Sequence, residues 1–370
     1  MKRHLVILVA ASAIAALFDR RVAAREQAGS RAGEASNVIL VVSDGLRWQE
    51  VFRGADSALL FGDASVLGGD AEGVRRRYWR ATIAERRTAL MPFVWGSLVR
   101  DGELRGNRDL GSHVEVTNGM KFSYPGYNEM LVGHPDPRID RNEFGPNPNV
   151  TVFEWLNQRR EFRGRVAAFG TWDTFSDIFN VRRSGIHLHT TGSKPHDAVV
   201  QEAVLPYLAR QAPRALFVGY AETDDWGHEG RYDRFLDAAH AVDAFVAALW
   251  SAVQSNPGYR GNTTLVFTAD HGRGRTSSDW GHHGKDVPGS EETFILVLGP
   301  EAGARGELRN TANVEGQVAA LTASALGLQY DRSGCARRSE GMVGRVMMRL
   351  ANAGTALRAC YPGTRGGAIR

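Results

Sequence analysis

The stretch Asn37-Val-Ile-Leu-Val-Val-Ser-Asp44-Gly45 is an apolar run that ends in an aspartate and a glycine. A short continuous run of this kind, bounded by a turn signal, is typical of a strand that is buried on both faces. In an open α/β sheet, ligand sites form in the loops that follow the carboxyl ends of such strands. We therefore predict a core strand over Val38–Val42 and place the Asp44 carboxylate at the edge of a site.

The same pattern, an apolar run followed by acidic and histidine residues, occurs twice more. One piece is Ala-Leu-Phe-Val-Gly-Tyr-Ala-Glu-Thr-Asp224-Asp-Trp-Gly-His228, and the other is Thr-Thr-Leu-Val-Phe-Thr-Ala-Asp270-His271-Gly. In the first piece we expect a strand that ends in aspartate and then a tight glycine turn, which would bring Asp224 and His228 onto one ion. In the second piece the adjacent Asp270 and His271 can each reach one ion of a pair about 3.5–4 Å apart.

Two further pieces complete a candidate metal site. The piece Trp-Gly-His282-His283-Gly lies shortly after Asp270-His271. Ser123 precedes a predicted helix in Lys-Phe-Ser123-Tyr-Pro-Gly-Tyr. Three carboxylates and three imidazoles are a natural ligand set for two Zn²⁺ ions, with Mn²⁺ as the alternative. Taken singly, Asp44 and Ser123 are better explained as helix N-caps. The predicted metal-binding residues are Asp44, Ser123, Asp224, His228, Asp270, His271 and His283.

The remaining pattern alternates strands and helices. A helix centred on Val152, Phe153 and Leu156 precedes a strand at Val166–Phe169, and apolar residues recur with helical period after Arg231. Alternation of this kind predicts an α/β fold with a mainly parallel central sheet sandwiched between helices. We expect one catalytic domain over residues 37–350, with lid or cap insertions near 53–115 and 171–200. Within the first insertion, residues 53–80 have the glycine and aspartate content of a surface loop or lid.

The N-terminus has the pattern of an export signal. Lys2 and Arg3 precede an apolar stretch over Leu5–Phe18, which is too short to span a bilayer comfortably. We predict a signal peptide over residues 1–24 and a periplasmic or secreted bacterial protein without a stable membrane span. An uncleaved N-terminal anchor is the alternative.

Two cysteines, Cys335 and Cys360, lie near the C-terminus. Export would permit a disulfide between them, and two buried thiols are the alternative. Neither cysteine lies near the metal motifs, so a catalytic thiol is not expected.

The positive charge comes almost entirely from arginine. The chain has 41 arginines and four lysines and a formal net charge of +4. This bias indicates a GC-rich bacterial coding sequence more than a nucleic-acid surface, so no nucleic-acid role is expected. A cluster at residues 75–77, 80, 86 and 87 is interpreted as a solvated helix face, with attraction of an anionic substrate as the alternative.

These pieces, in this order, resemble the alkaline phosphatase superfamily over roughly residues 37–300. The most specific are Asp224-x-x-Gly-His228, Thr268-Ala-Asp270-His271-Gly272 and the later His-Gly. The match is most similar to the branch of type I phosphodiesterases, nucleotide pyrophosphatases and cofactor-independent phosphoglycerate mutases. The resemblance implies that Ser123 is a nucleophile that forms a covalent phospho-enzyme. It also implies one metal held by Asp44, Asp270, His271 and Ser123, and another held by Asp224, His228 and His283.

Two assignments within the resemblance are less direct. Asn142 is the candidate for the asparagine that holds a phosphoryl oxygen in the phosphodiesterases, with Asn147 and Asn128 as rivals. His283 is preferred to His282 because the ligand of the family directly precedes glycine. The interval of twelve residues from His271 to His283 is shorter than in the phosphodiesterases and is similar to the mutase arrangement.

The resulting hypothesis is an exported, metal-dependent phosphoric ester hydrolase, either a phosphodiesterase or a phosphomonoesterase, that acts on a small-molecule phosphate ester. A sulfatase is the nearest alternative, but Tyr127 stands where its Cys/Ser-x-Pro-x-Arg motif needs arginine, and Ser43-Asp44 replaces its paired aspartates. The motifs are also compatible with a phosphomutase or with a catalytically lapsed metal-binding module. The sequence leaves the ester type and the oligomeric state open.

Overall fold

The computed structural model describes residues 37–192, 197–300 and 302–330, which all belong to one compact unit. The predicted signal peptide, the two cysteines and the end of the predicted domain lie outside the described residues.

An eight-stranded sheet organises the fold, in the order β5-β4-β6-β1-β7-β8-β2-β9. Among the described strands of this sheet, only β8 is antiparallel to its neighbours, since it runs opposite to both β7 and β2. A separate parallel pair is formed by β3 and β10. The bounds are β1 Asn37–Ser43, β2 Gly102–Arg105, β3 His113–Glu115, β4 Val166–Gly170, β5 His187–Thr190, β6 Ala215–Tyr220, β7 Thr263–Thr268, β8 Ile295–Leu298, β9 Gly306–Glu307 and β10 Ala312–Val314.

Strand β1 lies between β6 and β7 and is buried along its whole length. Ile39 and Val41 join the apolar core on one face of the sheet, whereas Leu40 and Val42 join the core on the other face. This division follows from the alternation of side chains along a strand. It explains why the residues from Val38 to Val42 are all apolar.

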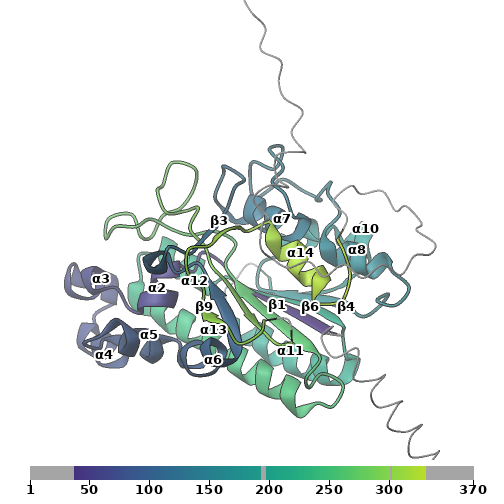
Figure 1. Ribbon diagram of the computed structural model, residues 1–370. Coiled ribbons are helices and arrows are strands. Elements are labelled where there is room, and N and C mark those ends of the chain that lie inside the picture. The colour runs from purple at the N-terminus through teal and green to yellow at the C-terminus, as the bar shows by residue number, and fades with distance from the viewer. Residues whose placement is uncertain (1–36, 193–196, 301, 331–370) are drawn as a thin grey trace, which may run out of the picture. The chain divides into compact units, whose positions relative to one another are not determined.

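Helices cover both faces of the sheet (Figure 1). One layer packs on the face of the sheet that carries Ile39. It contains α2 Trp48–Arg53, α3 Ser57–Phe61, α4 Ala71–Tyr78, α5 Ile83–Leu90, α6 Val99–Asp101, α11 Asp197–Gln211 and α13 Tyr232–Ser255. The opposite layer contains α7 Ser123–Val132, α8 Val152–Gln158, α9 Phe175–Ile178, α10 Val181–Ser184 and α14 Gln317–Ser324. The predicted α/β class, with a mainly parallel sheet between helical layers, is confirmed.

Helix α13 also has the length and apolarity of a membrane span, and it is the only described helix that does. Half of its apolar window is buried, and residues such as Phe235, Val242 and Leu249 pack in the core. The helix is therefore explained as the central core helix of its layer.

The expectation of a surface loop over residues 53–80 is wrong. This segment forms α3, the short helix η1 (Ala64–Leu67) and α4. The aspartates that suggested a loop are helix caps: Asp56, Asp63 and Asp70 accept hydrogen bonds from backbone N–H groups of the first turns. The apolar residues between the caps pack into the core, among them Leu59, Leu60, Leu67 and Val74.

Glu315 is a fully buried carboxyl group that precedes α14 and receives hydrogen bonds from Thr268 (3.0 Å) and Thr293 (2.7 Å). Burial raises its pKa from 4.5 to about 8, and Glu129 adds to the shift. Because the folded-state pKa exceeds the unfolded-state value, the folded state binds the proton more tightly. The stabilisation is complete below pH 4.5 and is lost as pH rises towards 8.

We therefore expect Glu315→Gln, which mimics the neutral carboxyl group, to gain thermal stability relative to wild type as pH rises from 5 to 9. One pKa unit corresponds to about 1.4 kcal/mol, so the gain should exceed about 2 °C in melting temperature. Thermal melts at several pH values measure it, with the exposed Glu143→Gln as control. If the difference in melting temperature between wild type and Glu315→Gln stays constant over this pH range, the raised pKa of Glu315 is contradicted.

Candidate metal centre

The seven predicted residues converge beyond the carboxyl ends of three neighbouring strands. Asp44 follows β1, Asp224 and His228 lie on α12 (Glu222–His228) after β6, and Asp270 and His271 follow β7. Because β6, β1 and β7 are adjacent and parallel, their carboxyl ends lie side by side. Ser123 at the start of α7 and His283 in the segment between β7 and β8 complete the group.

Asp44, Asp270 and His271 form the first cluster, which is buried. The Nε2 atom of His271 lies 3.3 Å from Oδ1 of Asp44 and 3.6 Å from Oδ2 of Asp270. The Oγ atom of Ser123 lies 3.5 Å from both Oδ1 of Asp44 and Nε2 of His271. Oδ1 of Asp270 accepts a hydrogen bond from the backbone N–H of Gly45, whereas the buried Oδ2 has no hydrogen-bond partner among the described residues. Donor atoms of four residues therefore lie close together.

Asp224, His228 and His283 form the second cluster. Nε2 of His228 lies 3.2 Å from Oδ2 of Asp224, and Nε2 of His283 lies 3.4 Å from Oδ1 of Asp224. The two imidazole Nε2 atoms face each other at 2.8 Å. Nε2 of His271 lies 3.9 Å from Oδ1 of Asp224, so the two clusters are neighbours.

The donor atoms fit two divalent cations. Ligand atoms about 2.0–2.1 Å from a tetrahedral zinc ion lie about 3.3–3.4 Å from one another. The distances between donors, 3.3–3.6 Å in the first cluster and 2.8–3.4 Å in the second, bracket that value. Carboxylate and imidazole donors also suit zinc. A possible buried metal site at Asp44, Asp270 and His271 is thus supported.

Two buried carboxyl groups in the first cluster favour a neighbouring positive charge. Burial raises the pKa of Asp44, and Asp224 raises it further. Burial and the charge of Asp44 raise the pKa of Asp270 well above its ordinary value. Burial alone would lower the pKa of His271, but Asp270 and Asp44 raise it to about 9. A cation bound among these groups would replace the proton on His271.

Neither Asp44 nor Ser123 is a helix cap. The N-cap of α2 is Arg47, and the N-cap of α7 is Phe122, whose side chain makes no capping hydrogen bond. Ser123 is the first residue of α7, so its hydroxyl is free to face the cluster. The capping interpretation of both residues is therefore wrong.

A tight turn presents Ser123 to the cluster. Lys121, two residues earlier, has a φ of 58°, in the left-handed region that side chains rarely adopt. Oδ1 of Asn118 accepts hydrogen bonds from the backbone N–H groups of Met120 and Lys121, and the carboxylate of Glu129 accepts those of Thr117 and Asn118. Backbone strain held by surrounding contacts is frequent at functional sites.

The three candidate asparagines have different surroundings. Oδ1 of Asn142 accepts a hydrogen bond from the backbone N–H of Tyr124, the residue after Ser123, at 3.0 Å. Asn147 donates to Asn128 and to the carbonyl of Ile178, so these two asparagines belong to another network. Asn142 is the one whose side chain contacts the start of α7 next to Ser123.

The expected glycine turn between Asp224 and His228 is instead a helix. Both residues lie on α12, and residues four apart on a helix share one face, which brings them to one cluster. Gly227 lies within this helix, where a Cβ atom would meet the guanidinium carbon of Arg273 at 2.6 Å. The glycine thus leaves room for the packed guanidinium group and does not form a turn.

Of the adjacent histidines, His283 belongs to the second cluster, whereas His282 is exposed and makes hydrogen bonds through its backbone. The side chain of His283 is 10% exposed. This placement agrees with the preference for the histidine that precedes glycine.

Sequence reasoning missed two residues that contact the site. The hydroxyl of Tyr127 donates to Oδ2 of Asp44 at 3.3 Å, and the fully buried Arg273 donates to Asp224. Nothing in the sequence distinguishes Arg273 from the other arginines except its position three residues after Asp270.

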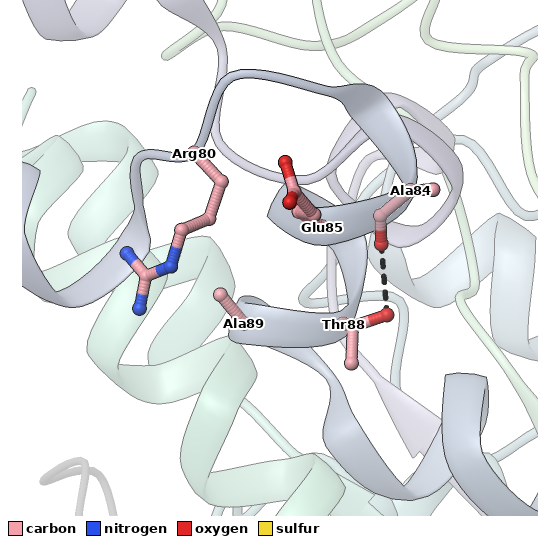
Figure 2. A pocket seen from close by; sticks show the side chains of 5 residues that line it. All are labelled: Arg80, Ala84, Glu85, Thr88 and Ala89. Atoms are coloured by element: carbon pink, nitrogen blue, oxygen red, sulfur yellow. Dashed lines mark hydrogen bonds between the residues drawn. The ribbon is translucent and has the colours of Figure 1, made fainter.

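The arginine cluster at residues 75–77, 80, 86 and 87 lies on and between α4 and α5. Its hydrogen bonds and ion pairs in the described structure involve no predicted metal-binding residue. Figure 2 shows a surface pocket there, lined by Arg80, Ala84, Glu85, Thr88 and Ala89, and none of these is a predicted site residue. The neighbouring arginines have local partners: Arg76 pairs with Glu72, and Arg77 with Asp237. Arg86 stacks on Trp79. These pairings favour the solvated helix face.

Comparison with solved structures supports the fold. Murine ectonucleotide pyrophosphatase/phosphodiesterase 5, an inactive variant in complex with AMP, matches with a TM-score of 0.51 and 12% identity over 80% of this chain and 96% of its own. The phosphonate monoester hydrolase of Agrobacterium radiobacter matches with a TM-score of 0.50 and 13% identity, over 79% and 74%. A 2-O GAG sulfatase matches with a TM-score of 0.52 and 12% identity, over 81% and 72%. At such identities these matches show the fold alone.

Comparison with curated protein sequences gives no match. A protein-family model, in contrast, matches residues 68–326, which include every predicted metal-binding residue except Asp44. That range exceeds half of the chain, and the resemblance to the alkaline phosphatase superfamily is confirmed. The chain belongs to the type I phosphodiesterase / nucleotide pyrophosphatase family.

Proposed function

We propose that this protein is a metal-dependent phosphoric ester hydrolase with Ser123 as its nucleophile. The observation that carries the proposal is the position of the Ser123 hydroxyl, 3.5 Å from a carboxylate and an imidazole of a buried cluster and at the first residue of a helix. Family membership supports a hydrolase of this kind. The helix N-terminus favours negative charge on the attacking oxygen and on the phosphoryl group.

The protein's own residues supply positioning and charge. Ser123 attacks phosphorus, the bond to the leaving alcohol breaks, and a phosphoserine forms; water then attacks the phosphoserine and releases phosphate or a phosphate monoester. Asp44 and His271 hold the serine oxygen in place. Two divalent cations would supply Lewis-acid polarisation and would lower the pKa of a bound hydroxyl or water. The donor types favour zinc, with Mn²⁺ as the alternative. Residues Asp44, Asp270, His271 and Ser123 would hold one cation, and Asp224, His228 and His283 the other.

Asn142 is proposed to donate its amide N–H to a phosphoryl oxygen, since its Oδ1 is already occupied by the N–H of Tyr124. We expect Asn142→Asp, which keeps an acceptor for Tyr124 but removes the donor, to lower kcat about 100-fold, the usual effect of deleting one oxyanion donor. Asn147→Asp is the matched control and should affect stability more than kcat. If Asn142→Asp turns over at the rate of wild type, Asn142 does not donate to the phosphoryl oxygen.

Export to the periplasm or the medium is part of the proposal and rests on the N-terminal sequence pattern alone. The proposed substrate is a small-molecule phosphate ester. The sulfatase alternative is disfavoured because Tyr127, at the position where arginine is needed, donates its hydroxyl to Asp44.

The test is a substrate comparison with the purified, zinc-loaded mature chain. Hydrolysis of p-nitrophenyl phosphate, bis-p-nitrophenyl phosphate and p-nitrophenyl sulfate is measured in parallel, with a manganese-loaded sample beside it. We expect turnover of at least one phosphate ester well above that of the sulfate. Faster turnover of the sulfate ester would reverse the assignment, and the ratio of the two phosphate esters defines the ester type.

A further inference from the structure

Arg273 joins the separate segments that carry the second cluster. Its Nη2 atom donates to the backbone carbonyl of Asp224 at 2.8 Å and also to Oδ1 of Asp224, and its Nη1 donates to the backbone carbonyl of Gly281. Asp224 and His228 lie on α12, whereas Gly281 lies two residues before His283. A single guanidinium group therefore holds the helix and the loop that must meet at this cluster.

The surroundings of Arg273 are built to hold it in one position. The side chain is fully buried and does not reach solvent. A Cβ atom at Gly227 would meet its guanidinium carbon at 2.6 Å, and one at Gly45 would meet its Nε at 2.9 Å. The guanidinium thus packs against two positions that carry no side chain, and its full burial points to a positioning role.

The two clusters differ in their number of carboxylates and in their contacts with Arg273. The first cluster has two carboxylates, Asp44 and Asp270, and makes no hydrogen bond with an arginine in the described structure. The second has one carboxylate, Asp224, whose Oδ1 is shared with the guanidinium while Oδ2 faces His228. A cation is therefore attracted more strongly to the first cluster, and the second depends on well-oriented ligands.

We propose that Arg273 is a positioning residue that raises the affinity of the Asp224/His228/His283 site specifically. This inference rests on the proposed two-metal function. Groups that orient the ligands of a metal change its affinity by about 10–100-fold when they are removed. Loss of Arg273 should thus weaken one site by that factor and leave the other unchanged.

The experiment is a zinc titration by calorimetry, with metal counted after dialysis, on wild type, Arg273→Gln and Arg273→Lys. Wild type is expected to bind two zinc ions with unequal affinity. Arg273→Gln should weaken the second ion about 10–100-fold. Arg273→Lys keeps the charge but cannot bond to Asp224 and Gly281 together, so its affinity should be intermediate. Circular dichroism checks that each variant is folded. If Arg273→Gln does not fold, the comparison of Arg273→Lys with wild type tests the inference.

Matched backgrounds identify the affected site. His283→Ala removes the second site, and adding Arg273→Gln to it should not change the affinity of the zinc that remains; His282→Ala is the neighbouring control and should bind two ions. In an Asp270→Asn background, which lacks the first site, Arg273→Gln should weaken the remaining zinc. Unchanged binding in Arg273→Gln, or equal weakening at both sites, would overturn the inference.

The titration is independent of turnover. A wild type that binds two zinc ions but cleaves no phosphate ester would defeat the proposed function and leave the role of Arg273 standing. If wild type hydrolyses phosphate esters while Arg273→Gln binds zinc normally, the proposed function stands and the role of Arg273 is wrong.

Discussion

Replacement of Ser123 by alanine is expected to lower kcat for the best phosphate ester by about 10³-fold or more, since loss of a nucleophile is among the largest single effects in enzymes. Alanine removes the Oγ atom that lies 3.5 Å from Asp44 and from His271 and leaves the remaining cluster in place. Ser123 is 6% exposed, and only its hydroxyl is lost, so the substitution removes little packing. Thermal stability should therefore stay close to that of wild type. Steady-state kinetics with bis-p-nitrophenyl phosphate and p-nitrophenyl phosphate measure the effect.

Ser123→Thr is the matched variant because it restores a hydroxyl at the same position. Measurable turnover by Ser123→Thr together with its loss in Ser123→Ala would assign the effect to the hydroxyl. If Ser123→Ala retains the rate of wild type, another group attacks phosphorus and the assignment of the nucleophile is wrong.

Replacement of Asp270 by asparagine is expected to remove the tighter zinc ion and to lower kcat by about 10³-fold. The substitution deletes the charge of a fully buried carboxylate whose Oδ2 atom has no hydrogen-bond partner within the described part of the chain. Its Oδ1 accepts from Gly45, a role that an amide oxygen can keep. The size of the effect follows from the loss of one ligand in a site where electrostatic stabilisation is usually the largest contribution.

Metal counting after dialysis checks this expectation, with Asp286→Asn as the exposed control. The control should keep two zinc ions and full turnover. An Asp270→Asn protein that still holds two ions and turns over normally would show that this carboxylate is not a metal ligand. Chelation of wild type, followed by recovery with added zinc, should reproduce the loss and its reversal.

The strands that carry the site were predictable because burial on both faces leaves a strong pattern. Val38–Val42 has no polar residue, and the structure extends this strand only to Asn37–Ser43. The chain then leaves the sheet, and Asp44 lies just beyond the end of the strand, where the sequence pattern places it. The antiparallel direction of β8 was not predictable, because its buried sequence has no feature that reports direction.

Other features depended on tertiary contacts. The five-residue interval of Asp224–His228 is compatible with both a turn and one turn of helix, and the glycine within it favoured the wrong choice. In the structure that glycine packs against the guanidinium group of Arg273, which belongs to a separate segment of the chain. Similarly, Asp56, Asp63 and Asp70 indicate a loop when read locally and are helix caps once their helices pack on the core.

The most direct test of the central claim is mass spectrometry of the enzyme quenched during turnover of a phosphate ester. We predict the added mass of one phosphoryl group on the peptide that contains Ser123, and its absence from the same peptide of Ser123→Ala. Turnover with no phosphoryl group on this peptide, or with the group on a different residue, would contradict the assignment of Ser123 as the nucleophile.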